Sequence, residues 1–225
     1  MQHQSDSVSL IYPLVSIVER LPLETMFPSA QPLEVELGSG DGSFLAKYAG
    51  LHHERNFIGV ERLLGRIRKI DRKGQRANLT NLRLLRLEAS YVLEFLLPKH
   101  AVDVIHVYFP DPWPKRKHRK NRLVNIRFTD LTREALKPNG VIYLRTDDAD
   151  YFAQMLEVFT DSPYFEETET SEELSAQITD FERGFLARNV QTRRAAYRLR
   201  AHAKTTADIL AYSKQNKQSC FSICF

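Results

Sequence analysis

The stretch that most strongly constrains the fold is Leu33-Glu34-Val35-Glu36-Leu37-Gly38-Ser39-Gly40-Asp41-Gly42-Ser43. A short apolar strand leads into a turn with glycines at alternate positions, and a helix follows. Glycine adopts backbone angles that a β-carbon forbids, and it lets a ligand lie against the main chain. In a sheet of crossover units, such a first turn lies at the carboxyl edge, where ligands bind.

Outward from this stretch, short apolar strands alternate with helices. The expected strands are Leu33–Leu37, Phe57–Glu61, Leu82–Leu87, Val102–Phe109 and Val141–Leu144, with two more at Phe165–Thr170 and Ala195–Arg200. The expected helices are Ser43–Ala49, Leu63–Ala77, Tyr91–Leu97, Phe128–Leu136 (closing at Pro138-Asn139-Gly140) and Tyr151–Phe159. This alternation predicts an α/β fold, with right-handed crossovers and a parallel sheet that helices cover on both faces.

The chain divides into three expected segments. Residues 1–32 carry four proline breaks and are expected to be a lead-in with one short helix. Residues 33–203 form the main domain, and residues 204–225 form a tail with a fraying helix. No apolar run is long enough to span a bilayer, and no secretory signal is evident. We therefore expect a cytoplasmic protein that is a monomer or weak homodimer, with no obligate protein partner.

Only two cysteines occur, Cys220 and Cys224, and their spacing to histidine does not indicate a metal site. The net charge of +4 is less informative than its distribution. Residues 115–122 hold six Lys or Arg and no acid, and a second basic stretch runs from Arg62 to Arg76. Unopposed cations at this density favour a phosphate-bearing partner for 115–122. For Arg62–Arg76, a solvated helix face is an equally good explanation.

The glycine loop fits two classes of nucleotide ligand. A dinucleotide fingerprint reads G-x-G-x-x-G, but here Gly42 comes one residue early and Ser43 takes the place of the last glycine. The loop also brings two acids, Glu36 and Asp41, which would repel a pyrophosphate. They suit a ligand that carries a sulfonium and an ammonium group. The loop therefore favours S-adenosylmethionine.

Further acids follow the next two strands. Glu61 ends the second strand, where a carboxylate can accept hydrogen bonds from ribose hydroxyls. Glu88 ends the third, where it could accept from an adenine amino group. Each acid alone is an ordinary solvent-facing residue. Because successive strand ends line one crevice, the three acids together predict a donor-binding site.

The fourth strand leads into Phe109-Pro110-Asp111-Pro112-Trp113-Pro114, immediately before the basic run. Proline fixes its own φ and keeps the preceding residue out of the right-handed helical region. We therefore expect Asp111 to be held extended at the strand end. A structural corner with a packed Trp113 is the alternative explanation.

Together, Pro110–Lys115 and the basic run Arg116–Lys120 resemble the signature of the bacterial tRNA (guanine-N7-)-methyltransferases. The resemblance covers about Leu33 to Arg200. It includes Gly59-Val60-Glu61, Leu144-Arg145-Thr146-Asp147 and a T-x-x-E motif at Thr179-Asp180-Phe181-Glu182. It implies a Rossmann-like class I methyltransferase fold, with a seven-stranded, mostly parallel sheet whose last strand is antiparallel. It also implies methyl transfer from S-adenosylmethionine to N7 of a variable-loop guanine in tRNA.

The resemblance implies three groups of site residues. Glu36, Gly38, Gly40, Gly42, Glu61, Glu88 and Asp111 would contact the donor. Lys115, Asp147, Thr179, Asp180, Phe181 and Glu182 would contact the substrate. Lys117, His118, Arg119, Lys120 and Arg122 would contact RNA. Glu88 departs from the family, which more often has aspartate or asparagine at that position.

Guanine N7 has a free lone pair and no proton, so its methylation needs no general base. The product gains positive charge, which a nearby carboxylate would stabilise. Asp111 is our candidate catalytic residue, with Asp147 beside it, although Asp147 could also belong to a helix cap for 149–159. Two alternatives remain from the sequence: a methyltransferase for another RNA base, and an RNA-binding protein that keeps the fold without catalysis.

Overall fold

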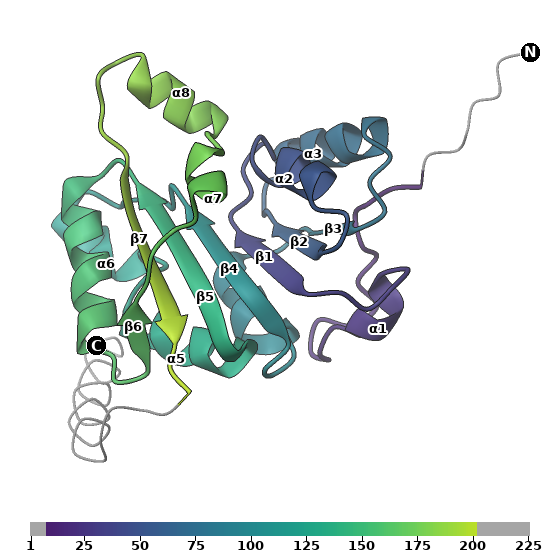
Figure 1. Ribbon diagram of the computed structural model, residues 1–225, viewed down its shortest axis with the longest axis horizontal. Helices are drawn as coiled ribbons and strands as arrows, with labels where there is room; N and C mark the ends of the chain where they lie inside the picture. Colours follow the sequence, from purple (N-terminus) through teal and green to yellow (C-terminus); the bar gives the residue numbers. More distant parts are fainter. Residues whose placement is uncertain (1–7, 202–225) are drawn as a thin grey trace, which may run out of the picture.

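The computed structural model describes residues 8–201 and contains a seven-stranded sheet of order β3-β2-β1-β4-β5-β7-β6 (Figure 1). Strands β1 to β5 pair in parallel, and β7 pairs antiparallel with both β5 and β6. Their bounds are β1 Leu33–Leu37, β2 Asn56–Val60, β3 Leu82–Leu85, β4 Val102–Tyr108, β5 Leu136–Thr146, β6 Phe165–Glu167 and β7 Arg193–Leu199. The predicted mostly parallel sheet with an antiparallel last strand is confirmed.

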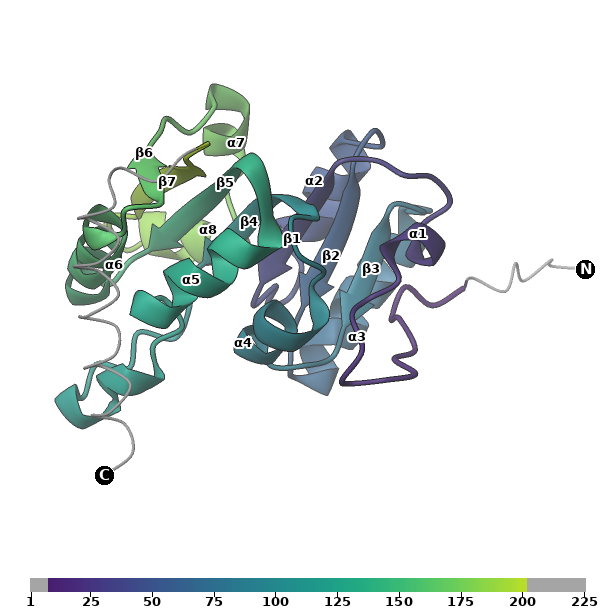
Figure 2. The ribbon, with the colours of Figure 1, turned by 90° about the horizontal axis from the view of Figure 1, so that it is seen from below.

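Helices cover both faces of the sheet. Their bounds are α1 Leu23–Met26, α2 Leu45–Leu51, α3 Leu64–Arg76, α4 Ala89–Tyr91, η1 Val92–Leu96 (a π-helix), η2 Arg116–Asn121 (a 3-10 helix), α5 Ile126–Ala135, α6 Ala149–Asp161, α7 Glu172–Ala176 and α8 Asp180–Leu186. Figure 2 shows α4 and α5 on one side of the sheet and α2 and α7 on the other.

The two faces correspond to two hydrophobic clusters. One cluster joins apolar side chains of η1, α5 and α6 to the sheet, and the other joins those of α2, α3 and α7. Every residue of β1 and β2 is buried. Strands buried on both faces usually read as continuous apolar runs, but β1 alternates apolar residues with Glu34 and Glu36, and both glutamates are buried.

A charged network lies inside the second cluster. The Glu34 carboxylate accepts from Arg55 at 2.7 Å and meets His106 Nε2 at 2.7 Å, while His106 Nδ1 meets the Tyr108 hydroxyl at 2.8 Å. Burial works to raise the pKa of Glu34, but the hydrogen bonds and charges of His106 and Arg55 outweigh it and lower that pKa. A buried carboxylate is tolerable only when it is paired in this way, so Glu34 is part of the frame of the sheet.

The structure differs from the sequence prediction in several places. β5 begins at Leu136 and includes Pro138, Asn139 and Gly140, although the sequence predicts the end of a helix at these residues. Asn139 has φ +65°, and the pairing of β4 with β5 shifts register between Val102 and Val104, so the turn-like residues lie in an irregular strand start. β3 ends at Leu85, two residues before the predicted end. The predicted helix of the tail lies outside the described residues.

The lead-in segment contributes little regular structure. In the lead-in, residues 8–32 contain one short helix, α1. Within 8–201, no helix is long and apolar enough to cross a membrane.

Candidate active site

The predicted site residues gather around the carboxyl ends of the parallel strands. There, α7 and α8 lie beyond the ends of β4, β5 and β7 (Figure 1). The Asp180 N–H donates to Ser43 Oγ at 3.1 Å, and the Phe181 ring lies 3.6 Å from the position that a β-carbon on Gly40 would take. The helix that follows the T-x-x-E threonine therefore packs directly over the glycine loop.

Three glycines of this loop need the left-handed region. Gly38, Gly40 and Gly42 have φ +85°, +56° and +72°. A β-carbon on Gly42 would lie 2.8 Å from the Ile70 side chain of α3. Gly42 comes one residue earlier than the last glycine of a dinucleotide fingerprint, and it allows a close approach of the loop to α3.

Glu36 stands out among the acids of the site. Its side chain is buried, and its Oε2 atom has no hydrogen-bond partner among the described residues. Burial raises the pKa of Glu36 to about 8, although the positive charge of Arg145 works in the opposite direction. An unpartnered buried carboxylate oxygen is costly, and a cationic ligand group at the loop would satisfy it.

Asp41, the second acid that the sequence predicts to face the donor, is paired with a lysine in the structure. Its carboxylate lies 3.3 Å from Lys73 Nζ on α3 and accepts from the Ser43 N–H at 3.1 Å. Burial works to raise its pKa, but Lys73 and Ser43 together lower it. Asp41 therefore ties the loop to α3, and the cationic-ligand argument rests on Glu36.

Glu61 shapes the loop from the neighbouring strand end. It is buried, and its two carboxylate oxygens accept from the Gly40 N–H at 3.0 Å and the Leu63 N–H at 2.8 Å. Each carboxylate oxygen has further lone pairs, so these bonds leave capacity for a ligand hydroxyl. A ribose contact by Glu61 stays a prediction.

Glu88 does not lie at a strand end. It comes three residues after β3, its side chain is exposed, and its nearest ionic partner is Arg62 at 3.9 Å. The misplaced end of β3 caused this difference. The structure gives Glu88 no enclosed position from which to contact an adenine.

The segment after β4 begins beside the glycine loop, because β4 is the neighbour of β1 in the sheet. Phe109 and Trp113, each followed by proline, have φ +52° and +44°. A bulky residue in this region is strained and needs surrounding contacts to hold it. Phe109 has them, because its ring packs against Phe181 at 6.3 Å and Phe185 at 5.3 Å between centroids.

Asp111 lies between these two strained residues. It is exposed and has no hydrogen-bond or ion-pair partner within residues 8–201. Trp113 is half-buried, with its ring edge-on to His118 at 5.9 Å. The two explanations of this segment therefore both hold in part: Trp113 packs in a corner, and that corner presents a free carboxylate.

Arg122 corrects one prediction. It is 2% exposed, and its guanidinium donates to Pro112 O at 2.7 Å, Gln154 Oε1 at 2.8 Å and Asp150 Oδ2 at 2.6 Å. It also lies 4.7 Å from the centroid of the Tyr151 ring. Arg122 is thus enclosed and anchors the segment to α6, which is not the exposed position that an RNA contact requires.

The other predicted RNA contacts lie on or beside η2. Lys117 and Lys120 are exposed and have no acidic partner in the described part of the chain, and the same holds for the preceding Lys115 and Arg116. Arg119 pairs with Asp150 at 2.9 Å, and His118 packs against Trp113. Four free cations in six residues therefore face solvent next to Asp111.

The T-x-x-E motif forms a capping box for α8. The Glu182 N–H donates to Thr179 Oγ1, and the Thr179 N–H donates to Glu182 Oε2, each at 3.0 Å. Both side chains are buried, so a substrate contact by Thr179 or Glu182 stays a prediction. Asp147 is half-buried, and its neighbour Asp148 provides the N-cap of α6 instead. The Asp147 side chain is therefore not used as a cap.

Arg145 is the residue that sequence reasoning missed. It lies on β5, is 2% exposed, and donates to Glu182 Oε2 at 2.9 Å and to the carbonyls of Leu174 and Gln177 at 2.6 Å each. Burial works to raise the pKa of Glu182, but the Thr179 N–H, Arg145 and Arg194 together lower it. An arginine inside a strand carries no sequence signal for such a role, because arginines are mostly exposed.

Several known proteins similar to this chain are methyltransferases. A family profile described as "Putative methyltransferase" matches residues 30–195. The tRNA (guanine-N(7)-)-methyltransferase of Chromohalobacter salexigens is 36% identical over 168 residues, which cover 73% of this chain and 68% of that protein. The enzyme of the same name from Alkalilimnicola ehrlichii is 32% identical over 209 residues, or 88% of each chain. The chain belongs to the tRNA (guanine-N(7)-)-methyltransferase family.

Solved structures agree with this family at the level of the fold. The 16S rRNA methyltransferase KamB superposes with a TM-score of 0.57 at 14% identity, covering 79% of this chain and 92% of that one. A SAM-dependent O-methyltransferase from Thermotoga maritima superposes with a TM-score of 0.52 at 14% identity, covering 81% of this chain and 65% of that one. At such identities the likeness extends to the fold alone.

Proposed function

We propose that this chain transfers a methyl group from S-adenosylmethionine to N7 of a guanine in the variable loop of tRNA. Membership of the tRNA (guanine-N(7)-)-methyltransferase family supports the reaction. The observation that carries the proposal is Asp111, a free carboxylate between the strand end beside the glycine loop and four free cations. Asp111 makes no hydrogen bond or ion pair within residues 8–201, so its carboxylate is available to a ligand.

The donor site fits S-adenosylmethionine on evidence from this chain. Glu36 leaves a buried carboxylate oxygen without a partner, as expected if a cationic group completes it. Gly38, Gly40 and Gly42 let a ligand lie against the main chain, and two further acids follow the flanking strands: Glu61 directly after β2 and Asp111 three residues after β4. When bound, S-adenosylmethionine supplies an electrophilic methyl group. Glu88, being exposed, is the weakest of the proposed donor contacts.

The acceptor side needs alignment more than proton transfer. Guanine N7 has a lone pair and no proton to remove, so no residue has to act as a base at that atom. Asp111 and Asp147 stabilise the positive charge that develops on the base, and each can accept from the guanine N1–H or amino group. Lys115 and the Thr179–Glu182 turn complete the proposed substrate contacts, with the base held close to the donor loop.

The cations beside Asp111 hold the RNA. Lys117 and Lys120, with His118 and Arg119 next to them, contact backbone phosphates, which position the RNA without reading its sequence. Moving a stacked base to the site costs a few kcal/mol, and these contacts offset that cost. We place the methyltransferase domain at 33–203, acting as a monomer or weak homodimer on tRNA in the cytoplasm. The profile match over 30–195 supports the domain.

The test is to incubate the protein with labelled S-adenosylmethionine and unmodified tRNA, and then cleave the product chemically at 7-methylguanine. We expect label in tRNA and one cleavage site in the variable loop. Label without cleavage there would overturn the N7 assignment and support methylation of another base. Binding of tRNA with no transfer of label would support a non-catalytic RNA-binding protein.

A further inference from the structure

The basic stretch Arg62–Arg76 has no role in the proposed reaction, and most of it is the helix α3. This helix carries six cations, Arg66, Arg68, Lys69, Arg72, Lys73 and Arg76, and one acid, Asp71. Asp71 accepts from the Leu10 N–H at 2.7 Å and from Ser9 Oγ at 3.1 Å, so its charge faces the lead-in segment. The remaining charged side chains of α3 are all cations.

Four of these cations form one stripe. Arg66, Lys69, Lys73 and Arg76 follow each other at spacings of three, four and three residues, which places them along a single face of a helix. Ile67 and Ile70 point to the core instead. Lys69 and Lys73 are four residues apart, and like charges at that spacing destabilise a helix. We call the four residues the α3 stripe.

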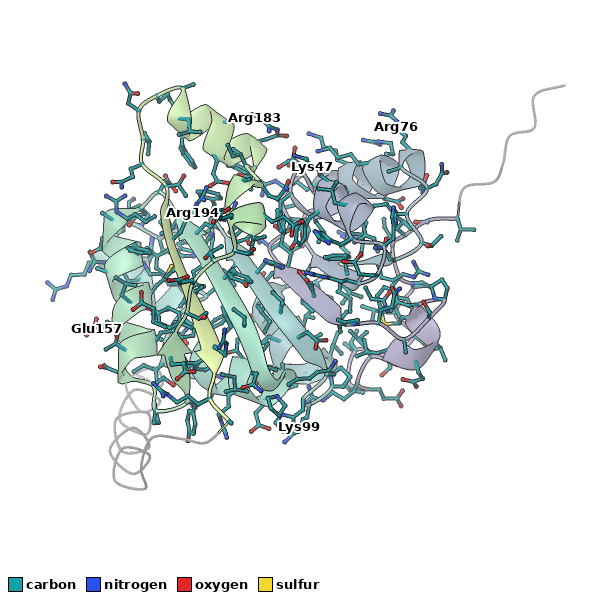
Figure 3. All side chains as sticks on the ribbon, in the orientation of Figure 1. Lys47, Arg76, Lys99, Glu157, Arg183 and Arg194 are labelled. Carbon is teal, nitrogen blue, oxygen red and sulfur yellow. The ribbon has the colours of Figure 1, made fainter. Side chains whose placement is uncertain are left out.

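The α3 stripe runs beside the glycine loop. Lys73 Nζ lies 3.3 Å from the Asp41 carboxylate, and an Arg66 guanidinium nitrogen lies 3.9 Å from Glu61 Oε2. Lys69 and Arg76 are exposed and have no acidic partner in residues 8–201. Figure 3 shows Arg76, Lys47 and Arg183 along the same edge of the molecule, the one at which α2, α3 and α8 lie.

The stripe and the cations of η2 belong to opposite faces of the sheet. α3 packs in the cluster of α2 and α7, whereas η2 is tied through Arg119 and Arg122 to α6, which packs in the other cluster. The donor loop and Asp111 lie between them, at the ends of β1 and β4. A polyanion that touched both basic surfaces by the direct route would extend across the strand ends that carry the donor loop and Asp111.

We propose that the α3 stripe is a second tRNA-binding surface, which holds backbone phosphates on the donor side of the site while η2 holds them on the acceptor side. This inference rests on the proposed function, since it concerns how the same tRNA substrate is bound. Contacts on both flanks fix the direction of the RNA across the pocket. One flank alone would let the RNA pivot about η2.

The experiment compares two double variants that each remove two positive charges. Lys69→Gln/Arg76→Gln neutralises the free cations of the stripe and leaves the pairs with Asp41 and Glu61 intact. Lys99→Gln/Lys137→Gln is the control, because both lysines lie near the amino ends of β4 and β5, at the opposite edge, where Lys99 pairs with Glu134 and Lys137 with Asp103. Figure 3 shows Lys99 at that edge.

For the stripe variant we expect the slope of log Kd for tRNA against log salt to fall by about 1.4 to 1.8, at about 0.7–0.9 per lost phosphate contact. KM for tRNA should rise, while kcat at saturating tRNA and the affinity for S-adenosylmethionine stay unchanged. The control should keep the wild-type slope. The single variant Arg76→Gln, at the last residue of the helix, should give half the effect on the slope. It keeps the test informative if the double variant misfolds.

An unchanged slope in the stripe variant, or an equal loss in the control, would overturn the inference. Failure of the proposed function is a separate result, because it is read from the wild-type protein: no methyl transfer to tRNA guanine N7. If the wild type methylates tRNA and both variants bind like it, the function stands and the α3 stripe is a solvated helix face.

Discussion

The donor loop and the acceptor segment are neighbours in space, but they are held in different ways. The loop Glu36–Gly42 is fixed from within: backbone N–H groups bond to Glu61 and Val60, and Gly42 packs on Ile70. The segment Phe109–Arg122 is held near its two ends, by the ring contacts of Phe109 and by the buried Arg122. Between those ends it offers exposed charge.

This difference shows which kind of ligand each region can bind. Among the buried side-chain atoms of the loop, one oxygen of Glu36 has no partner within the described residues, and a small ligand that carries a positive charge would satisfy it. The segment has four free cations and a free carboxylate, a combination suited to a large polyanion that brings a base with it. Preformed sites favour small ligands, whereas phosphate contacts tolerate a looser arrangement.

The largest effect should come from Asp111, the point at which the two regions meet. We expect Asp111→Ala to lower kcat by roughly 10²–10³-fold, the usual range for removing one group that stabilises developing charge. Affinity for tRNA should change far less, because phosphate contacts carry it. Glu157→Gln, an exposed acid on α6, is the control and should leave both quantities unchanged. Equal losses in kcat and in tRNA affinity would assign Asp111 to binding.

The second prediction concerns Glu36 and the pH dependence of stability. Its pKa of about 8 in the donor-free protein lies above the ordinary 4.5, so the folded state keeps a proton that the unfolded state releases. The stability due to the neutral carboxyl is complete below about pH 4.5 and is lost as the pH rises through about 8. Thermal melts without ligand should therefore show a Tm that falls as the pH rises from about 4.5 to about 8. Glu36→Gln should remove that part of the fall.

The same residue ties stability to donor binding. A cationic ligand favours the ionised carboxylate, so binding near neutral pH should release a proton that calorimetry in buffers of different ionisation enthalpy detects. Glu36→Gln should abolish the release and weaken the affinity for S-adenosylmethionine by roughly 10- to 100-fold, the range for a hydrogen bond to a charged group. Proton release that persists in Glu36→Gln would show that another group titrates.

The comparison also explains which features the sequence predicted. Strand β1 was placed correctly to the residue, because apolar residues at alternate positions mark its length and Gly38 marks its end, although Glu34 and Glu36 are buried as well. The turn after β1 was also predicted correctly, because its glycines have the positive φ angles that such a turn requires. β5 was placed too late, since the irregular start through Pro138–Gly140 resembles a loop in local sequence.

The functions of charged residues were harder to predict, because burial is a tertiary property. Arg122 and Lys120 look alike in the basic run, yet one is enclosed and the other is exposed. Arg145 was overlooked, although it supports α8 by binding Glu182. Nothing local in the sequence distinguishes a cation that bonds inward from one that faces solvent.

The smallest effect follows from that distinction. We expect Arg122→Met to lower the free energy of unfolding by about 1–2 kcal/mol, because hydrogen bonds of a charged group to Pro112 O and Gln154 are lost while half-exposed Asp150 can return to water. Urea denaturation measures it. Lys117→Met is the matched control: it should leave stability unchanged and flatten the salt dependence of tRNA binding by about 0.7–0.9 in slope. Arg122→Met should do the reverse, since an enclosed guanidinium cannot reach a phosphate. If Arg122→Met flattened the slope at unchanged stability, the segment would have to open on RNA and turn Arg122 outward, and the acceptor side would then be remodelled by its substrate while the donor side is not.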